Sequence, residues 1–158
     1  MCYKRRYYEK GAVYYVTSVT KDRKTLLNKG SASLFLICSL AYHKFIFSYR
    51  IYAFVIMPDH FHALIQPEGN YDISKIMNYI KGTFARKYNK MFKHKGIVWQ
   101  KSFHDKVCRT EKEVLRKIEY THNNPVKIGM VKKPGDYMYS SYQQCLGQRT
   151  SDFVDKIR

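Results

Sequence analysis

Two histidines separated by one residue, His60 and His62, lie in an apolar run that ends at Ile65. Because the side chains of a β-strand alternate between two faces, an extended run puts both imidazoles on one face and Phe61, Ala63 and Ile65 on the other. Neighbours on one face are about 6.6–6.8 Å apart at Cα, which lets both rings reach one ion at about 2.1 Å. The pattern predicts part of a metal site, with two half-exposed strand histidines as the alternative.

A tyrosine and an asparagine lie four residues apart, at Tyr120 and Asn124, near the end of a predicted helix. At about 100° per residue, Val114, Leu115 and Ile118 form the apolar stripe of this helix, and Tyr120 lies well away from it. Residues four apart share one side of a helix, so the phenol and the amide face the same way. A tyrosine can act as a covalent nucleophile, and an amide oxygen can be the third ligand of a cation that two histidines hold. The alternative is an ordinary surface tyrosine.

The charge of the chain is strongly positive. Its 158 residues include 29 Lys and Arg against 12 Asp and Glu, for a formal net charge of +17. Such an excess is typical of proteins whose partner is a polyanion that releases counterions on binding. The 15 tyrosines and 9 phenylalanines supply rings that can stack on unpaired bases. The composition favours a nucleic-acid partner, although ribosomal and membrane-surface proteins share it.

Composition also excludes several classes of protein. A hydrophobic fraction of 45% supplies a core, which excludes intrinsic disorder as the main state. The cysteines (Cys2, Cys38, Cys108 and Cys145) form no Cys-x-x-Cys pair, which indicates reduced thiols of a cytosolic protein. The longest nearly apolar stretch, residues 32–42, is shorter than the roughly 18 residues of a membrane span. We expect a cytoplasmic protein without a membrane segment or a signal peptide.

Strand and helix signals alternate in an order typical of one α+β domain over residues 1–158, with a basic arm at 1–10 and a short tail at 143–158. Strands are predicted at 12–20, 49–57 and 60–66, with a Pro58-Asp59 turn between the last two, and residues 98–109 are extended. Helices are predicted at 31–43, at 72–92, and from a Thr110–Glu113 capping box to about 124, where Pro125 ends the third. This order predicts a ferredoxin-like or RRM-like β-α-β-β-α-β antiparallel sheet with helices on one face, plus an added C-terminal helix that bears the tyrosine.

Four motifs together resemble one family. Residues 56–65, Ile-Met-Pro-Asp-His-Phe-His-Ala-Leu-Ile, resemble the His-hydrophobic-His motif of the single-tyrosine HUH transposases of the insertion-sequence type, including its Met-Pro-Asp-His lead-in. Residues 120–129 resemble the Tyr-x-x-x-Asn-Pro-Val-Lys segment of the REP-associated tyrosine transposases, and residues 98–103 and 136–142 fit the same branch. The resemblance runs from near Tyr3 to about Tyr142, which is nearly the whole chain.

The resemblance implies a role for each matching residue. His60 and His62 would bind a divalent ion, Mg²⁺ or Mn²⁺, with Asn124 in the place of the third ligand and Tyr120 as the nucleophile. The implied function is cleavage and rejoining of single-stranded DNA near hairpins through a 5′-phosphotyrosine intermediate. Members of the family work either as monomers or as homodimers that build each site from two chains. Chemistry supports these roles, since a divalent ion on a phosphate oxygen stabilises the charge that develops when a phenolate attacks phosphorus.

Basic residues near these motifs are candidates for contacts to DNA. They are Arg5, Arg6, Lys81, Arg86, Lys87, Lys117, Lys127, Lys132 and Lys133. Lys117, one turn before the tyrosine, could also stabilise the phenolate, although any one of these residues can be a solvated charge. Two other functions remain open. One is a domesticated, non-catalytic module that binds palindromic repeats, and the other is a basic subunit of a ribonucleoprotein.

Overall fold

The computed structural model describes residues 8–147 and 153–157 of the chain. Its strands are β1 (Val13–Val19), β2 (Tyr49–Ile56), β3 (His60–Pro67) and β4 (His104–Cys108). Its α-helices are α1 (Gly30–Phe47), α2 (Ile73–Phe92), α3 (Glu111–Lys127) and the short α4 (Tyr142–Cys145). Two 3-10 turns, Lys21–Arg23 and Pro134–Asp136, complete the elements.

The four strands form one antiparallel sheet in the order β2-β3-β1-β4. This is the order of a ferredoxin-like sheet, so the predicted β-α-β-β-α-β arrangement is confirmed. Strands β1 and β3 lie in the centre, with Thr17 opposite His62 and Val19 opposite His60. Each central strand is paired on both sides, which makes the middle of the sheet the most constrained part of the fold.

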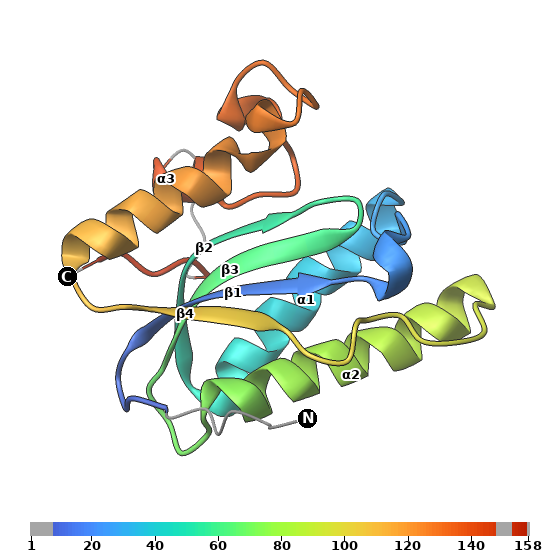
Figure 1. Cartoon of the computed structure of the whole chain (residues 1–158), viewed down its shortest axis with the longest axis horizontal. Coiled ribbons are helices and arrows are strands. Elements are labelled where there is room, and N and C mark those ends of the chain that lie inside the picture. Colours follow the sequence, from blue (N-terminus) through green and yellow to red (C-terminus); the bar gives the residue numbers. More distant parts are fainter. Residues whose placement is uncertain (1–7, 148–152, 158) are drawn as a thin grey trace.

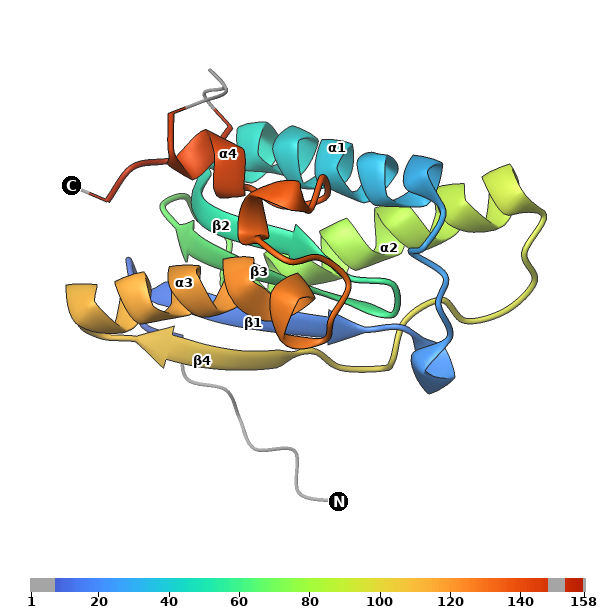
Figure 2. The ribbon, with the colours of Figure 1, turned by 90° about the horizontal axis from the view of Figure 1, so that it is seen from above.

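Helices cover both faces of the sheet (Figures 1 and 2). Helices α1 and α2 pack on one face, where the main core includes Leu36, Phe61, Ile65 and Phe84. Helix α3, the added helix, lies across the opposite face over a smaller cluster that includes Tyr15. The predicted alternation in β3 is therefore confirmed: odd-numbered residues from 61 to 65 face α1 and α2, and the histidines face α3.

Helix α3 begins as the sequence predicts but ends later. The Thr110 hydroxyl accepts a hydrogen bond from the Glu113 amide at 3.2 Å, and the Glu113 carboxylate accepts one from the Arg109 amide at 2.7 Å. The prediction that Pro125 ends the helix is wrong, because α3 continues through it to Lys127. Near a helix end the missing N–H of a proline removes only one hydrogen bond. The backbone then closes with hydrogen bonds to the carbonyls of residues 124, 125 and 126.

Two other boundaries differ from the predicted ones. Only residues 104–108 of the segment predicted as extended pair in the sheet as β4, and residue 99 makes an isolated bridge to Thr20. Helix α1 is longer than predicted, and among the described residues it is the one helix long and apolar enough to cross a membrane, with a mean hydropathy of 1.3. Its inner side belongs to the core, since Leu36 and Leu40 are fully buried.

Candidate active site

The two histidines lie at the start of β3 with their rings close together. The ring centroids of His60 and His62 are 4.8 Å apart and the planes are inclined at 76°. The antiparallel register places His62 beside Thr17 of β1. Both imidazoles therefore project from the centre of the sheet toward α3.

His62 is buried and held on one side of its ring by two hydroxyl groups. Its Nδ1 lies 2.7 Å from the Tyr15 hydroxyl and 2.8 Å from the Thr17 hydroxyl, and the Tyr15 ring stacks on the imidazole at 5.3 Å. Burial, followed by the charges of His60 and Lys117, lowers the pKa of His62 to about 3. The imidazole is therefore neutral at physiological pH. A neutral imidazole with a partner at Nδ1 has its Nε2 lone pair available for a metal.

His60 is oriented by a neighbouring carboxylate. Its Nδ1 lies 2.5 Å from Oδ1 of Asp59, and the other oxygen of Asp59 is 3.1 Å from the Arg23 guanidinium. Burial alone would raise the pKa of Asp59, but the hydrogen bonds and charges of His60 and Arg23 lower it overall. The carboxylate accepts the Nδ1–H hydrogen bond, so Nε2 of His60 is again the nitrogen left for a metal.

Helix α3 brings the asparagine and the tyrosine to the same place. The amide Nδ2 of Asn124 is 3.2 Å from Nε2 of His62, and the same amide group carries an oxygen that a divalent metal accepts. The Tyr120 ring lies 6.1 Å from the rings of both His62 and Tyr15, with the side chain 41% exposed. The tyrosine therefore lies beside the imidazoles with part of its side chain open to solvent.

Two ammonium groups lie near the tyrosine. Nζ of Lys117 lies 4.9 Å from the Tyr120 ring centroid and 4.2 Å from the Tyr15 ring centroid. Nζ of Lys127 lies 5.6 Å from the Tyr120 ring centroid. Positive charge this close to the ring would stabilise a phenolate and attract a phosphate group.

The two histidines, the tyrosine and the asparagine line a cavity of about 260 Å³. Its walls are formed by Thr17, Val19, Arg23, His60, His62, Tyr120, Asn124, Lys127 and Ile128. No group of three or more His, Cys, Asp or Glu side chains that could hold a metal occurs in the described part of the chain. A metal here would therefore have two imidazoles and one amide oxygen as protein ligands, with the remaining positions left for water or phosphate oxygens.

The structure separates the predicted DNA-binding residues into groups. Arg5 and Arg6 lie outside the described residues. Lys127 lines the cavity and Lys117 flanks its tyrosine, while Lys132 and Lys133 are exposed just after α3. Arg86 and Lys87 are exposed on α2, which covers the face of the sheet opposite Tyr120.

The prediction for Lys81 is wrong. This side chain is only 7% exposed, and its ammonium donates hydrogen bonds to the carbonyls of Gln100 and Ser102 at 2.9 and 3.3 Å. The Lys81 carbonyl in turn accepts a hydrogen bond from the Trp99 indole. Lys81 therefore connects α2 to the segment before β4 by hydrogen bonds, and its charge is not exposed to DNA.

Sequence reasoning missed the residues that hold the histidines. Tyr15 and Thr17 alternate along β1, so the period of a strand places them on one face, but nothing in the sequence gives the register that sets them opposite His62. The sequence places Asp59 in the turn and in the lead-in to the histidine motif but predicts no role for its carboxylate. Its position next to His60 is a signal, since a carboxylate is a common partner of a ligating histidine.

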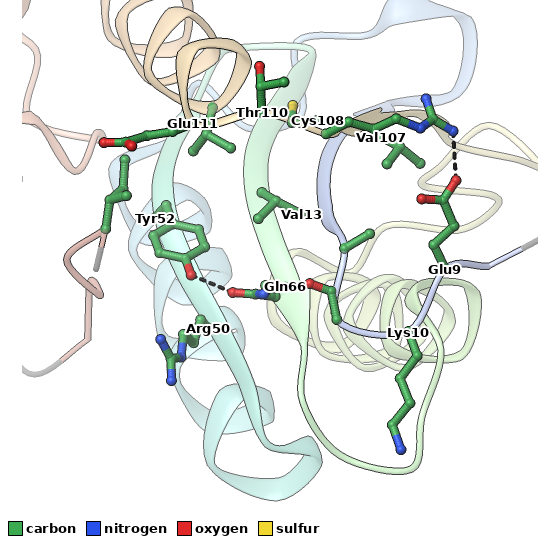
Figure 3. Close-up of a pocket in the computed structure, with 15 residues that line it drawn as sticks. Glu9, Lys10, Val13, Arg50, Tyr52, Gln66, Val107, Cys108, Thr110 and Glu111 are labelled. Carbon is green, nitrogen blue, oxygen red and sulfur yellow. Dashed lines mark hydrogen bonds and ion pairs between the residues drawn. The ribbon is translucent and has the colours of Figure 1, made fainter.

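A larger cavity, of about 650 Å³, lies at the opposite end of the same face of the sheet (Figure 3). The start of β1, the end of β4 and the start of α3 form it, and none of the predicted site residues lines it. Its arginines are paired with acids, Arg109 with Glu9 and Arg50 with Glu68, each at 2.6 Å. The smaller cavity is therefore the one that combines a tyrosine, two imidazoles, an asparagine and a lysine.

Comparisons with known proteins identify relatives of this fold. A solved structure of a REP-associated tyrosine transposase bound to a REP hairpin superposes with a TM-score of 0.78 and 25% identity, over 100% of this chain and 99% of that one. A structure from Deinococcus radiodurans, at 23% identity and a TM-score of 0.55 over 78% of this chain and 97% of that one, shares the fold.

Two sequence relatives are each 30% identical to the chain. One is the REP-associated tyrosine transposase of Escherichia coli K12, with 89% of this chain and 82% of the relative aligned. The other, from Haemophilus influenzae, is assigned to the same group, with 89% and 85% aligned. Residues 9–124 match the family described as "Transposase IS200 like". The chain therefore belongs to the IS200-like transposases, within the group of REP-associated tyrosine transposases.

Proposed function

We propose that this protein is a metal-dependent, single-stranded DNA strand transferase that cuts and rejoins DNA beside hairpins, with Tyr120 as its nucleophile. One observation carries the proposal. The tyrosine, the asparagine amide and two oriented imidazoles of a single chain converge on one cavity, with Asn124 in contact with His62 and the Tyr120 ring 6.1 Å from it. A surface tyrosine or a structural histidine pair would not require this convergence.

The residues fit a divalent cation. His60 and His62 each have a hydrogen-bond partner at Nδ1, and Asn124 supplies an amide oxygen. When bound there, Mg²⁺ or Mn²⁺ would act as a Lewis acid on a non-bridging phosphate oxygen. The protein contributes the orientation of the ligands, because Asp59 on one ring and the hydroxyls of Tyr15 and Thr17 on the other fix which nitrogen points into the cavity.

The tyrosine performs the covalent step. After loss of its proton, the phenolate oxygen of Tyr120 forms a bond to phosphorus, and the bond from phosphorus to the 3′ oxygen breaks. The leaving oxygen takes up a proton and becomes a free 3′-hydroxyl, while the 5′ end stays attached to the protein. The ammonium group of Lys117, which lies over the Tyr120 ring, stabilises the phenolate by its positive charge. Attack by a 3′-hydroxyl on the phosphotyrosine reverses the step and joins a strand without ATP.

Hairpin DNA is the proposed substrate, by analogy with the relative that is bound to a REP hairpin. Lys127, Lys132 and Lys133 extend the positive surface beyond the cavity along the chain that follows α3. These cations would hold the phosphates that flank the cut. The reaction would take place in the cytoplasm, where the DNA lies. Binding of this kind weakens steeply as salt rises.

A denaturing gel with 3′-labelled hairpin DNA tests the proposal. With Mn²⁺ or Mg²⁺, the wild-type protein should give a labelled covalent adduct, because the fragment that stays on the tyrosine carries the 3′ end. Tyr120→Phe should remove the adduct and keep hairpin binding. Tyr79→Phe is the matched control, since Tyr79 is similarly exposed, at 46%, but lies on α2. An adduct that survives in Tyr120→Phe would refute the assignment of Tyr120 as the nucleophile. Binding without any adduct on varied hairpins would indicate a non-catalytic module.

A further inference from the structure

A buried histidine of α3, His122, lies midway in the sequence between Tyr120 and Asn124. It is only 4% exposed, and it is not among the residues that line the cavity. At about 100° per residue, its side chain is turned by about 200° around the helix from each of these two neighbours. One side of α3 therefore faces the imidazoles, and the opposite side carries a buried polar group that needs a partner of its own.

The partner of His122 is Ser141, which comes after α3 in the chain. Nε2 of His122 lies 2.8 Å from the Ser141 hydroxyl, and the Tyr142 ring lies edge-on to the imidazole at 5.4 Å. Ser141 is fully buried. Because a hydrogen bond depends on direction as well as distance, a buried polar pair holds a helix at one rotation more narrowly than apolar contacts do.

Ser141 is itself fixed to the sheet. It ends a short segment, residues 137–141, by which the chain returns from α3 to the edge strand β2 (Figure 2). The Ser141 amide donates to the Phe54 carbonyl at 3.0 Å, and the Phe54 amide donates to the Ser141 hydroxyl at 2.9 Å. The Ile56 amide donates to the Tyr139 carbonyl at 2.8 Å. Ser141 therefore has a defined position on β2 and can locate the helix that contacts it.

The register of the sheet places this attachment close to the site. Strand β2 pairs with β3 so that Val55, the residue after the partner of Ser141, is opposite His62. Asn124 contacts the same His62 from α3 at 3.2 Å. Helix α3 is therefore located against β3 at two points, directly through its asparagine and indirectly through His122 and β2.

We propose that His122 and Ser141 are positioning residues for the covalent step, because their hydrogen bond sets the rotation of α3 that turns Tyr120 toward the imidazoles. This inference rests on the proposed function. The ends of side chains lie about 5–6 Å from a helix axis, so a rotation of about 10° moves the phenol by about 1 Å. A misplacement of about 1 Å can lower the rate of a reaction by about 100-fold.

The rate of adduct formation and the affinity for hairpin DNA, measured separately, test the proposal. His122→Leu removes the hydrogen bond but keeps an apolar side chain in the space, and the Ser141 hydroxyl keeps the Phe54 carbonyl as a partner at 3.3 Å. At saturating DNA this variant should form the adduct about 10- to 100-fold more slowly and bind the hairpin within about twofold of wild type. His122→Gln should recover most of the rate, since its amide group can take the place of Nε2.

His43→Leu is the matched control. It also replaces a buried histidine, 3% exposed, whose Nδ1 lies 3.3 Å from a serine hydroxyl, but it lies on α1. It should leave the adduct rate unchanged at a temperature where all variants are folded, as checked by circular dichroism. A wild-type rate in His122→Leu, an equal loss in His122→Gln, or a loss of hairpin affinity as large as the loss of rate would each overturn the positioning role.

An NMR measurement on the protein alone separates this inference from the proposed function. The ring centroids of Tyr120 and His62 are 6.1 Å apart, so their ring protons should give a nuclear Overhauser effect in the wild-type protein. His122→Leu should lose this signal and keep the amide spectrum of β1 and β3, and His122→Gln should restore it. If the wild-type protein forms no adduct, the proposed function fails, and this signal still decides the role of His122. Its persistence in His122→Leu would overturn the inference.

Discussion

The two hydroxyl groups beside Nδ1 of His62 lead to a specific prediction about metal affinity. Tyr15 and Thr17 lie 2.7 and 2.8 Å from this nitrogen, but an imidazole that binds metal through Nε2 has only one Nδ1–H to donate. Either oxygen alone can therefore accept it. We expect Tyr15→Phe and Thr17→Val, taken singly, to change Mn²⁺ affinity by about threefold or less, because each variant keeps one acceptor and the packing around the ring.

The double variant Tyr15→Phe/Thr17→Val should behave differently. It leaves a buried N–H of His62 without a partner and allows the ring to turn. Loss of such a partner typically lowers metal affinity by about 10- to 100-fold, equivalent to about 1.4–2.7 kcal/mol. The effect of the pair would therefore exceed the product of the two single effects, which is the signature of redundant groups.

Isothermal titration of Mn²⁺ into each protein measures these affinities. Tyr49→Phe is the control for general destabilisation, because it removes a buried hydroxyl that donates to the Leu40 carbonyl, far from the site. It should lower the free energy of unfolding without changing Mn²⁺ affinity. Wild-type affinity in the double variant would refute the role of the hydroxyls in orienting His62, and a full loss in either single variant would refute their redundancy.

Three further predictions concern acid stability and salt. Burial lowers the pKa of His43 below 6.5 despite its hydrogen bond to the Ser39 carbonyl, so the folded state favours the neutral ring. The free energy of unfolding is therefore highest above pH 6.5, and it declines as the pH falls below that value and the unfolded chain takes up a proton. Urea titrations should show that His43→Leu flattens the acid decline by up to about 1.4 kcal/mol per pH unit, and parallel curves for the two proteins would contradict this. Lys127→Gln should reduce the slope of log affinity for hairpin DNA against log salt by about 1. Lys81→Met should leave that slope unchanged and lower the melting temperature, and a reduced slope for Lys81→Met would show that this lysine reaches DNA after all.

The elements that the sequence predicts well are those with a strong period or a local signal. The alternation from residue 60 to 65, the amphipathic pattern of α2 and the Thr110–Glu113 capping box depend on neighbours a few residues away. Pro125 misleads because its usual effect as a helix breaker is small near a helix end, where few hydrogen bonds remain to be lost. The end of α1 is hard to predict because this helix is apolar on its outer side as well as on its inner side, which leaves no clear period in the sequence.

The parts of the site that were missed depend on tertiary contacts. Whether Lys81 faces solvent or the segment before β4 is decided by where residues 100 and 102 pass, which no local pattern encodes. The hydroxyls beside His62 likewise follow from the register of β1 against β3. His60, His62, Tyr120 and Asn124 could be selected from the sequence because their residue types are chemically distinctive and their spacing within each element is local.

The placement of the site across two elements of unequal rigidity has a consequence for amide hydrogen exchange. The histidines belong to a central strand whose neighbours pair with it on both sides, whereas the tyrosine is near the end of a helix with Ile128 and Gly129 exposed just beyond it. Amides of residues 61–65 should exchange only through global opening, and those after Tyr120 through fraying of the last turn. Bound DNA should therefore slow exchange at the end of α3 and leave β3 unchanged, and this result would indicate that Tyr120 moves relative to a fixed pair of imidazoles.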